Sequence, residues 1–200
     1  AILRAVRGWF ENQGFTEVEP NLVVPSPGAE AHIEAVAADG GYLHTSPEFA
    51  MKRLLAAGET KIFYLGKCWR KGETGPLHAP EFTMIEWYRL GMDHHGLMRD
   101  VEALLRALLE PLRPVGPTVH VTYAEAFESA IDVNPLSSPT GRIESALRAA
   151  GLDVPAGLRD DRDGLFDLAM ATQVTSRFAD DRITFVRDFP ASQAALARIA

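Results

Sequence analysis

The chain has 200 residues, of which 46% are apolar and 24% charged, and this is the composition of a globular protein with a substantial core. Its net charge of −7 gives no support for a dominant phosphate-binding surface, although it leaves room for a local basic patch. The single cysteine, Cys68, excludes an internal disulfide and a cysteine-rich metal site, and it fits a reducing compartment such as the cytoplasm.

The first 13 residues carry apolar side chains at helical spacing, which predicts a helix that stops at Gly14. Arg4 and Arg7 interrupt this stretch, so we expect no signal peptide, and no other apolar run approaches the length of a membrane span. The next predicted elements are an extended segment at 15–24, a turn-rich loop at 25–32 and a short strand at 42–45.

A helix is expected to begin at Ser46-Pro47-Glu48, because serine caps helices and proline suits the first helical position, and to stop at Gly58. Two strands are expected at 61–70 and 81–89, joined by a polar, glycine-rich loop. Residues 93–113 predict a long amphipathic helix, and 134–180 a mainly helical segment. Further elements are a strand at 119–121, helices at 123–130, 142–150 and 161–177, and a strand at 183–186. Strands with long helices between them predict an α+β fold with a mixed sheet.

The second long strand has an unusual face. Its alternate positions, which lie on one side of a strand, are Phe82, Met84, Glu86 and Tyr88. A carboxylate among aromatic side chains does not suit an ordinary core face, since a buried carboxylate needs a partner. For Glu86 that partner is Arg53, Arg89 or the ammonium group of a ligand, and Phe82 is either a core residue or a platform for a nucleobase.

Four residues before this strand have both an ordinary and a functional interpretation. Arg70 ends the first long strand, and its planar guanidinium suits either a surface ion pair or a phosphate oxygen. His78 is either a solvated loop residue or a phosphate contact. Ser46 and Glu48 suit a helix cap and its dipole, whereas the functional interpretation makes Glu48 a carboxylate for a substrate amine.

Other common sites have no support in this sequence. His94-His95 lacks the cysteine or suitably spaced acidic residues that would complete a zinc set, so we expect no metal site. There is no nucleophile elbow and no P-loop motif, which argues against serine hydrolases and P-loop nucleotidases.

Several of these residues, with their spacing, resemble class II aminoacyl-tRNA synthetases of the lysine subgroup. The similar segments are Thr45-Ser46-Pro47-Glu48, Met51-Lys52-Arg53-Leu54-Leu55 with Gly58, Trp69-Arg70, and residues 78–88. The likeness covers residues 1–88 and weakens beyond them. It implies an α+β fold with an antiparallel sheet flanked by helices, in which residues 1–200 form a C-terminally incomplete catalytic domain of a homodimer.

Within this subgroup, the chain is most similar to the stand-alone paralogues that lysylate elongation factor P. The start at Ala1 is expected to leave no room for an anticodon-binding barrel, and Ser46 stands where lysyl-tRNA synthetases usually have alanine. Residues 188–197 also resemble a late signature of the paralogues. The implied activity is ATP-dependent activation of lysine or β-lysine and transfer to a lysine of elongation factor P. A lysyl-tRNA synthetase fragment and a non-catalytic binding paralogue are the alternatives, and tRNA is the less expected acceptor.

The resemblance also implies roles for individual residues. On the nucleotide side, Arg70 contacts the α-phosphate of ATP, Glu73 and His78 surround the nucleotide, and Phe82 stacks on adenine. On the amino-acid side, Glu48 lies near the substrate amino group, Glu86 and Tyr88 surround the side-chain ammonium, and Ser46 makes room for β-lysine.

The chain also departs from the family pattern. Gly72 replaces an expected carboxylate of the loop. The family continues beyond the position of Ala200 with the motif 3 arginine and the acidic ligands of Mg²⁺, so these groups are expected in a missing C-terminal part.

Overall fold

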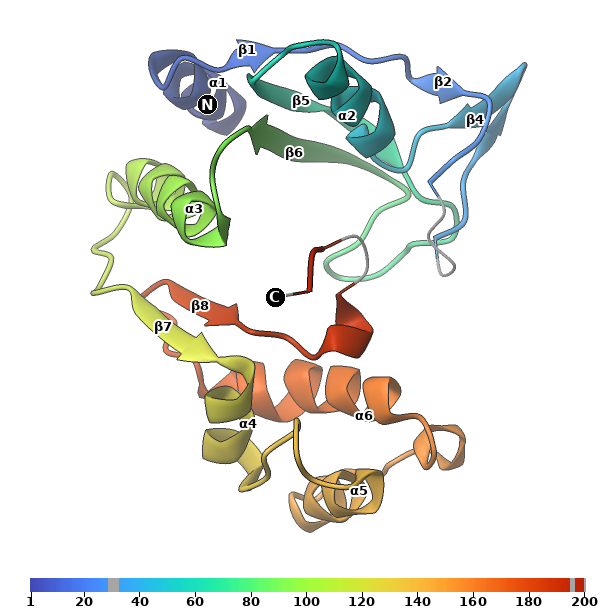
Figure 1. The fold of residues 1–200 in the computed structure, drawn as a ribbon, viewed down its shortest axis with the longest axis vertical. Helices are drawn as coiled ribbons and strands as arrows, with labels where there is room; N and C mark the ends of the chain where they lie inside the picture. Colours follow the sequence, from blue (N-terminus) through green and yellow to red (C-terminus); the bar gives the residue numbers. More distant parts are fainter. Residues whose placement is uncertain (29–32, 195–196, 200) are drawn as a thin grey trace. The chain divides into compact units, whose positions relative to one another are not determined.

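The computed structural model describes residues 1–28, 33–194 and 197–199. Residues 29–32 of the predicted loop, and residues 195–196 of the segment that resembles the late signature, therefore lie outside the described residues. The chain, drawn as a ribbon in Figure 1, divides into two compact units, Ala1–Leu108 and Leu109–Ala200. Each unit contains its own hydrophobic core.

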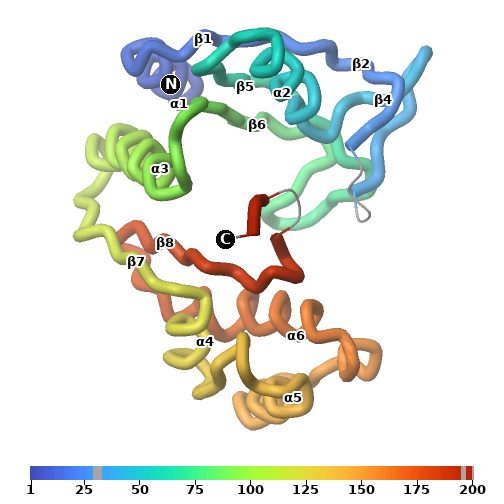
Figure 2. The backbone as a smooth tube through the Cα atoms, in the orientation of Figure 1, coloured from blue at the N-terminus to red at the C-terminus, as the bar shows by residue number. Residues whose placement is uncertain are grey.

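The first unit is built on a hairpin of two long strands, β5 (Lys61–Trp69) and β6 (Glu81–Arg89), which pair antiparallel along their whole length. Both strands and the loop between them agree with the sequence prediction, and the loop is easily followed in Figure 2. A short strand, β1 (Thr16–Glu17), pairs with the other edge of β5 in parallel. The sheet is therefore mixed, and its antiparallel part is the hairpin that carries the candidate site.

One face of this sheet is covered by α1 (Ile2–Asn12) and α3 (His94–Leu109). Phe10 of α1 stacks on Phe63 of β5 with 4.7 Å between the ring centroids, and Leu104 of α3 belongs to the same buried cluster. The helix predicted for residues 93–113 ends earlier, at Leu109. Pro111 explains this, because the residue before a proline is pushed away from helical geometry.

The opposite face of the sheet is covered by α2 (Glu48–Ala56). Met51 is fully buried there, in a cluster with Ile62 and Tyr64 of β5. Pro47 is the N-cap of the helix rather than its first helical residue, and Gly58 follows the helix at a φ of 114°, as expected of a glycine stop.

A second small antiparallel sheet contains β2 (Val23–Val24), β4 (Gly41–Leu43) and β3 (Ala37–Ala38), in that order. The pair Ala37–Ala38 was not predicted, because two alanines carry no strand signal. His44 follows β4 and joins this sheet to the hairpin, since its carbonyl oxygen accepts a hydrogen bond from the backbone N–H of Trp69 at 3.2 Å.

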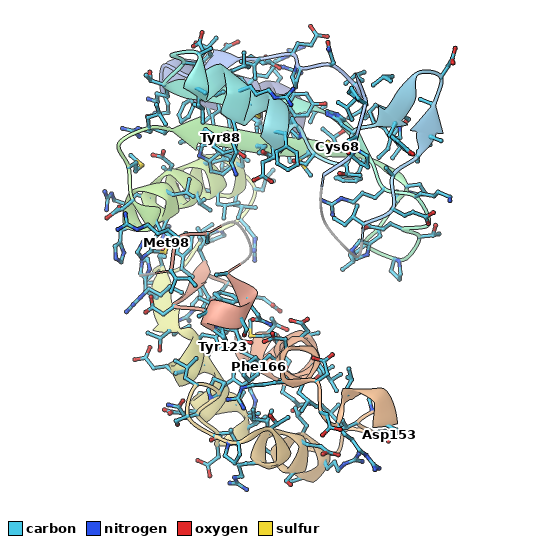
Figure 3. All side chains as sticks on the ribbon, turned by 45° about the vertical axis from the view of Figure 1, so that its right-hand side comes forward. Cys68, Tyr88, Met98, Tyr123, Asp153 and Phe166 are labelled. Atoms are coloured by element: carbon cyan, nitrogen blue, oxygen red, sulfur yellow. The ribbon has the colours of Figure 1, made fainter. Side chains whose placement is uncertain are left out.

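The second unit packs helices beside a parallel pair of strands, β7 (Val119–Thr122) and β8 (Thr184–Arg187). Its helices are α4 (Tyr123–Ile131), α5 (Thr140–Ala149) and α6 (Arg162–Ala169), with short turns at η1 (Ala156–Leu158) and η4 (Ala191–Gln193). After Ala169 the helix predicted for 161–177 continues as the π-helical turn η2 (Met170–Val174) and the 3₁₀ turn η3 (Thr175–Arg177). Tyr123 and Phe166, labelled in Figure 3, are both buried in the core of this unit. Among the described residues, no helix is both long and apolar enough to cross a membrane.

Candidate functional site

The candidate residues of β6 lie in one row on the face of the sheet that α2 covers. The register pairs them with residues of β5 as Phe82 with Cys68, Met84 with Gly66, Glu86 with Tyr64, and Tyr88 with Ile62. Directly paired residues of an antiparallel sheet share a face, which confirms the predicted common face. Cys68 and Tyr88 mark the two ends of the row in Figure 3.

Glu86 is held by two hydroxyl groups. The Tyr88 hydroxyl donates to Glu86 Oε1 at 2.8 Å, and the Ser46 hydroxyl donates to Glu86 Oε2 at 2.8 Å. Arg89, one of the cations expected to pair with Glu86, donates instead to Asp100 at 3.1 Å. Among the described residues no ion pair reaches Glu86, so this partly buried carboxylate keeps its negative charge available for a cation from outside the described chain.

The segment before α2 brings a second carboxylate to the same end of the row. Ser46 was expected to cap α2, but Pro47 is the N-cap; Ser46 Oγ accepts a hydrogen bond from the backbone N–H of Glu48 at 3.0 Å and donates one to Glu86. Glu48 forms an ion pair with Lys52 one turn later. The pKa of Tyr88 is raised by burial, by its hydrogen bond to Glu86 and by the charges of Glu86 and Glu48. This end of the row is therefore acidic.

Arg70 lies at the opposite end, directly after β5. Its guanidinium carbon lies 5.2 Å from the centroid of the Phe82 ring, a cation–π contact, and its Nη1 lies 3.9 Å from Glu73 Oε1. Its Nε is buried and finds no hydrogen-bond partner among the described residues. A buried N–H without a partner is uncommon in folded proteins, so this guanidinium can still donate to an anion.

Among the described residues, no hydrogen bond or ion pair joins His78 to Arg70. It ends a tight turn in which the backbone groups of Gly75 and His78 bond to each other at 3.1 and 3.2 Å. The histidine itself is exposed. Its predicted contact with a nucleotide therefore stays a prediction, and so does that of Glu73, whose Oε1 lies 3.9 Å from Arg70 Nη1.

Sequence reasoning missed a buried polar cluster beside the row, on the same face of the sheet. The Lys67 carbonyl oxygen accepts a hydrogen bond from Tyr64 Oη at 2.7 Å and lies 2.8 Å from His44 Nε2. The glycine inside β5 was the available signal. A Cβ at Gly66 would lie 2.5 Å from the Tyr64 ring, so the strand leaves room there for this phenol.

Cys68 lies in the same cluster and is fully buried. Burial raises the pKa of its thiol to about 12, the charge of Glu86 adds to this rise, and the charge of Arg70 opposes it. The thiol is thus a neutral packing group. No group of three or more His, Cys, Asp or Glu side chains gathers in a way that could hold a metal ion among residues 1–28, 33–194 and 197–199.

Residues 1–199 match the family model described as tRNA synthetases class II (D, K and N). The chain belongs to this family. The α+β fold expected from the sequence resemblance is thereby confirmed, and the hairpin of β5 and β6 with its row of side chains is part of a class II synthetase domain.

Curated relatives resemble almost the whole chain. The elongation factor P–(R)-β-lysine ligase of Vibrio cholerae serotype O1 is 39% identical over 99% of this chain, which corresponds to 63% of the relative. Proteins of the same name from Pseudoalteromonas translucida and Photorhabdus laumondii subsp. laumondii are 38% and 37% identical and are covered to 63% each. The chain therefore spans less than two thirds of the length of these class II relatives.

Proposed function

We propose that this chain is part of an ATP-dependent ligase that activates lysine or β-lysine as an aminoacyl-adenylate and transfers it to a lysine of elongation factor P. The observation that carries the proposal is the opposite charge of the two ends of the row on the hairpin. Among the described residues, Glu86 has two hydroxyl donors and no cation at one end, and the buried Nε of Arg70 has no hydrogen-bond partner at the other. The acceptor in this proposal is taken from the names of the relatives, which are elongation factor P–(R)-β-lysine ligases.

The acidic end suits the ammonium groups of the amino acid. In this proposal Glu86 binds the side-chain ammonium, with Ser46 and Tyr88 holding the carboxylate in place, and Glu48 lies near the other amino group. Two fixed hydroxyl donors leave a carboxylate oriented before the ligand arrives, which lowers the entropy lost on binding. The position of Ser46 beside Glu86 supports its expected role in accommodating β-lysine.

The opposite end suits the nucleotide. Phe82 lies about 13 Å from Glu86 along β6, because a strand rises about 3.3 Å per residue. Phe82 offers an aromatic face to adenine, and Arg70, next to that ring, donates to the α-phosphate. Glu73 beside Arg70 and His78 on the following turn complete the nucleotide surroundings in this proposal.

The chemistry follows in two steps. A carboxylate oxygen of the amino acid attacks the α-phosphorus of ATP, the bond from that phosphorus to the bridging oxygen breaks, and pyrophosphate leaves. The amine of the acceptor lysine then attacks the activated carbonyl carbon, AMP leaves with the oxygen, and the nitrogen loses a proton. Arg70 is placed to neutralise charge on the α-phosphate, and the row aligns the two reactants.

ATP and Mg²⁺ are the expected requirements of this reaction. The residues present fit the nucleotide, since the Phe82 ring lies beside a guanidinium whose Nε has no hydrogen-bond partner among the described residues. Mg²⁺ would supply charge neutralisation on the phosphates. The described residues contain no group of three or more His, Cys, Asp or Glu side chains that could hold it, and we propose that its ligands lie outside them.

The test is amino-acid-dependent exchange of pyrophosphate into ATP, followed by transfer of labelled amino acid. The protein from the complete coding sequence should support exchange with lysine or β-lysine and should label elongation factor P. Arg70→Ala should lower exchange at least 100-fold, since a group that stabilises developing charge contributes about 3–4 kcal/mol. Arg89→Ala is the matched control, because Arg89 lies on the same hairpin, directly after Tyr88, but pairs with Asp100.

The outcome distinguishes the three candidate functions. Labelling of tRNA without labelling of elongation factor P would make the protein a lysyl-tRNA synthetase. Binding of lysine without any exchange would make it a non-catalytic paralogue. Exchange that survives Arg70→Ala as well as it survives Arg89→Ala would contradict the role of Arg70.

A further inference from the structure

His44 is a buried histidine that the proposed reaction does not use. Only 3% of its surface is accessible to solvent, and it follows β4, two residues before Ser46. An imidazole loses its hydrogen bonds to water on burial, so its N–H group needs a partner inside the protein. Its Nε2 lies 2.8 Å from the carbonyl oxygen of Lys67. Because a carbonyl oxygen only accepts, Nε2 carries the hydrogen and donates it to Lys67.

Two aromatic rings hold the imidazole in this orientation. The Tyr64 ring meets it edge to face, with 5.7 Å between the centroids, and the Trp69 ring lies 6.0 Å away. Tyr64 Oη donates to the same Lys67 carbonyl oxygen at 2.7 Å. The two donors therefore converge on one acceptor and use both of its lone pairs.

The Lys67 carbonyl lies on an edge of β5 that is only partly covered. β1 pairs with the start of β5, and beyond it no other strand of the described chain pairs with this edge. The Leu65 carbonyl accepts a hydrogen bond from Arg7 at 3.2 Å, and the Lys67 carbonyl accepts one from His44. The backbone N–H of Trp69, next on the same edge, donates to the His44 carbonyl at 3.2 Å. His44 thus attaches its segment to β5 twice, through its side chain and through its backbone.

This double attachment fixes the short segment that carries Ser46. The Ser46 hydroxyl donates to Glu86 at 2.8 Å, and Pro47, the next residue, is fully buried. Ser46 is therefore held between two anchored residues, His44 and Pro47. Because a hydrogen bond weakens steeply when its distance or angle changes, a small shift of this segment would weaken the bond from Ser46 to Glu86.

We propose that His44 is a positioning residue for the amino-acid end of the row. Its hydrogen bond to the edge of β5 holds Ser46 where the serine hydroxyl orients the Glu86 carboxylate toward the substrate ammonium. In this role His44 acts through Ser46 and not on a reactant. The inference rests on the proposed function, because it concerns how the amino-acid site of that function keeps its geometry.

The kinetics of pyrophosphate exchange in the complete protein test this role. His44→Leu removes the donor but keeps a buried side chain, and the KM for lysine or β-lysine should rise about three- to tenfold, as expected for the loss of one hydrogen bond. The KM for ATP should stay within twofold of the wild type, because Arg70 and Phe82 lie at the other end of the row. His44→Gln should restore the KM for the amino acid to within twofold, since its side-chain amide can donate to the Lys67 carbonyl.

Tyr64→Phe is the matched control. It removes the other donor to the same Lys67 carbonyl, but Tyr64 belongs to β5 and does not attach the segment of Ser46 to the strand. The KM for the amino acid should therefore stay within twofold of the wild type in this variant. An effect as large as that of His44→Leu would assign the loss to the carbonyl group and overturn the role of His44.

A double variant shows whether His44 acts through Ser46. In a Ser46→Ala background, His44→Leu should change the KM for the amino acid by less than twofold, because the hydroxyl that His44 positions is gone. A further loss as large as that of His44→Leu alone would overturn the inference. If His44→Leu does not fold, His44→Asn takes its place in both backgrounds, because its shorter amide does not reach the Lys67 carbonyl.

Two other results would also overturn the inference while the proposed function stands. One is an unchanged KM for the amino acid in His44→Leu. The other is an equal rise of the KM for ATP and for the amino acid, without recovery in His44→Gln, which would make His44 a packing residue of the whole unit. Wild-type protein that supports no exchange would instead remove the proposed function itself.

Discussion

Replacing Glu86 by glutamine removes one charge from the acidic end of the row while keeping the size of the side chain. The two hydroxyl groups that hold Glu86 can adapt, because the hydroxyl of Ser46 or of Tyr88 can accept a hydrogen bond from the new amide. We therefore expect the fold to tolerate Glu86→Gln, with a loss in the free energy of unfolding of less than about 1.5 kcal/mol.

The effect on the amino acid should be much larger. A hydrogen bond to a charged group contributes about 1.5–3 kcal/mol, and removing one partner of a desolvated charge pair costs about 2–5 kcal/mol. Glu86 is partly exposed, so the lower part of this range applies, about 2–3 kcal/mol. At 1.4 kcal/mol for each factor of ten, the Kd for lysine or β-lysine should rise roughly 30- to 150-fold.

Titration calorimetry with lysine, with β-lysine and with ATP measures this difference directly. The Kd for ATP should change less than threefold, because Phe82 and Arg70 lie at the other end of the row. Glu81→Gln is the matched control, since Glu81 is on the same strand but pairs with Lys67 and is exposed. Equal losses for the amino acid and for ATP would refute the assignment of Glu86, and so would an equal effect of Glu81→Gln.

Two further predictions concern Phe82 and the buried thiol of Cys68, its directly paired neighbour on β5. Phe82→Ala should weaken ATP binding by about 1–3 kcal/mol, which raises the KM for ATP in the exchange assay roughly 5- to 150-fold. Phe82→Trp should retain ATP binding, because tryptophan keeps an aromatic face. Burial raises the pKa of Cys68 to about 12, from 9.0 as an ordinary thiol. The folded pKa is the higher one, so the stability that the neutral thiol contributes is complete below pH 9 and is lost as the pH rises toward 12. A thiol reagent at pH 8 should therefore label the native protein far more slowly than the urea-unfolded protein, and equal rates would contradict this burial.

The strands of the hairpin and the helices of both units could be predicted from the sequence, because their signals are local. The alternation of Phe82, Met84, Glu86 and Tyr88 placed these side chains on one face without knowledge of the partner strand. Boundaries were less certain where local signals compete. The helix that follows β6 ended at Leu109 because of Pro111, and the helix after Asp161 changed its hydrogen bonding at Met170.

The partner of Glu86 could not be predicted, because it depends on which residues the fold brings across the sheet. The sequence offered Arg53, Arg89 or a ligand ammonium. Arg89 pairs with Asp100, the hydroxyls of Ser46 and Tyr88 lie on the two carboxylate oxygens, and the ligand ammonium stays a prediction. Ser46 is 40 residues away along the chain. No local pattern encodes a contact of that separation.

By itself, then, the sequence determined the hairpin, its polar row and the likeness to class II synthetases, since periodicity and motif spacing are properties of neighbouring residues. Only the tertiary structure decided which groups complete the site. Two features depend on how distant segments pack: the Glu86 carboxylate held by Ser46, and the Arg70 Nε that has no partner among the described residues. Whether a polar group is satisfied or left free is determined by its neighbours in space, and those neighbours are fixed only when the chain has folded.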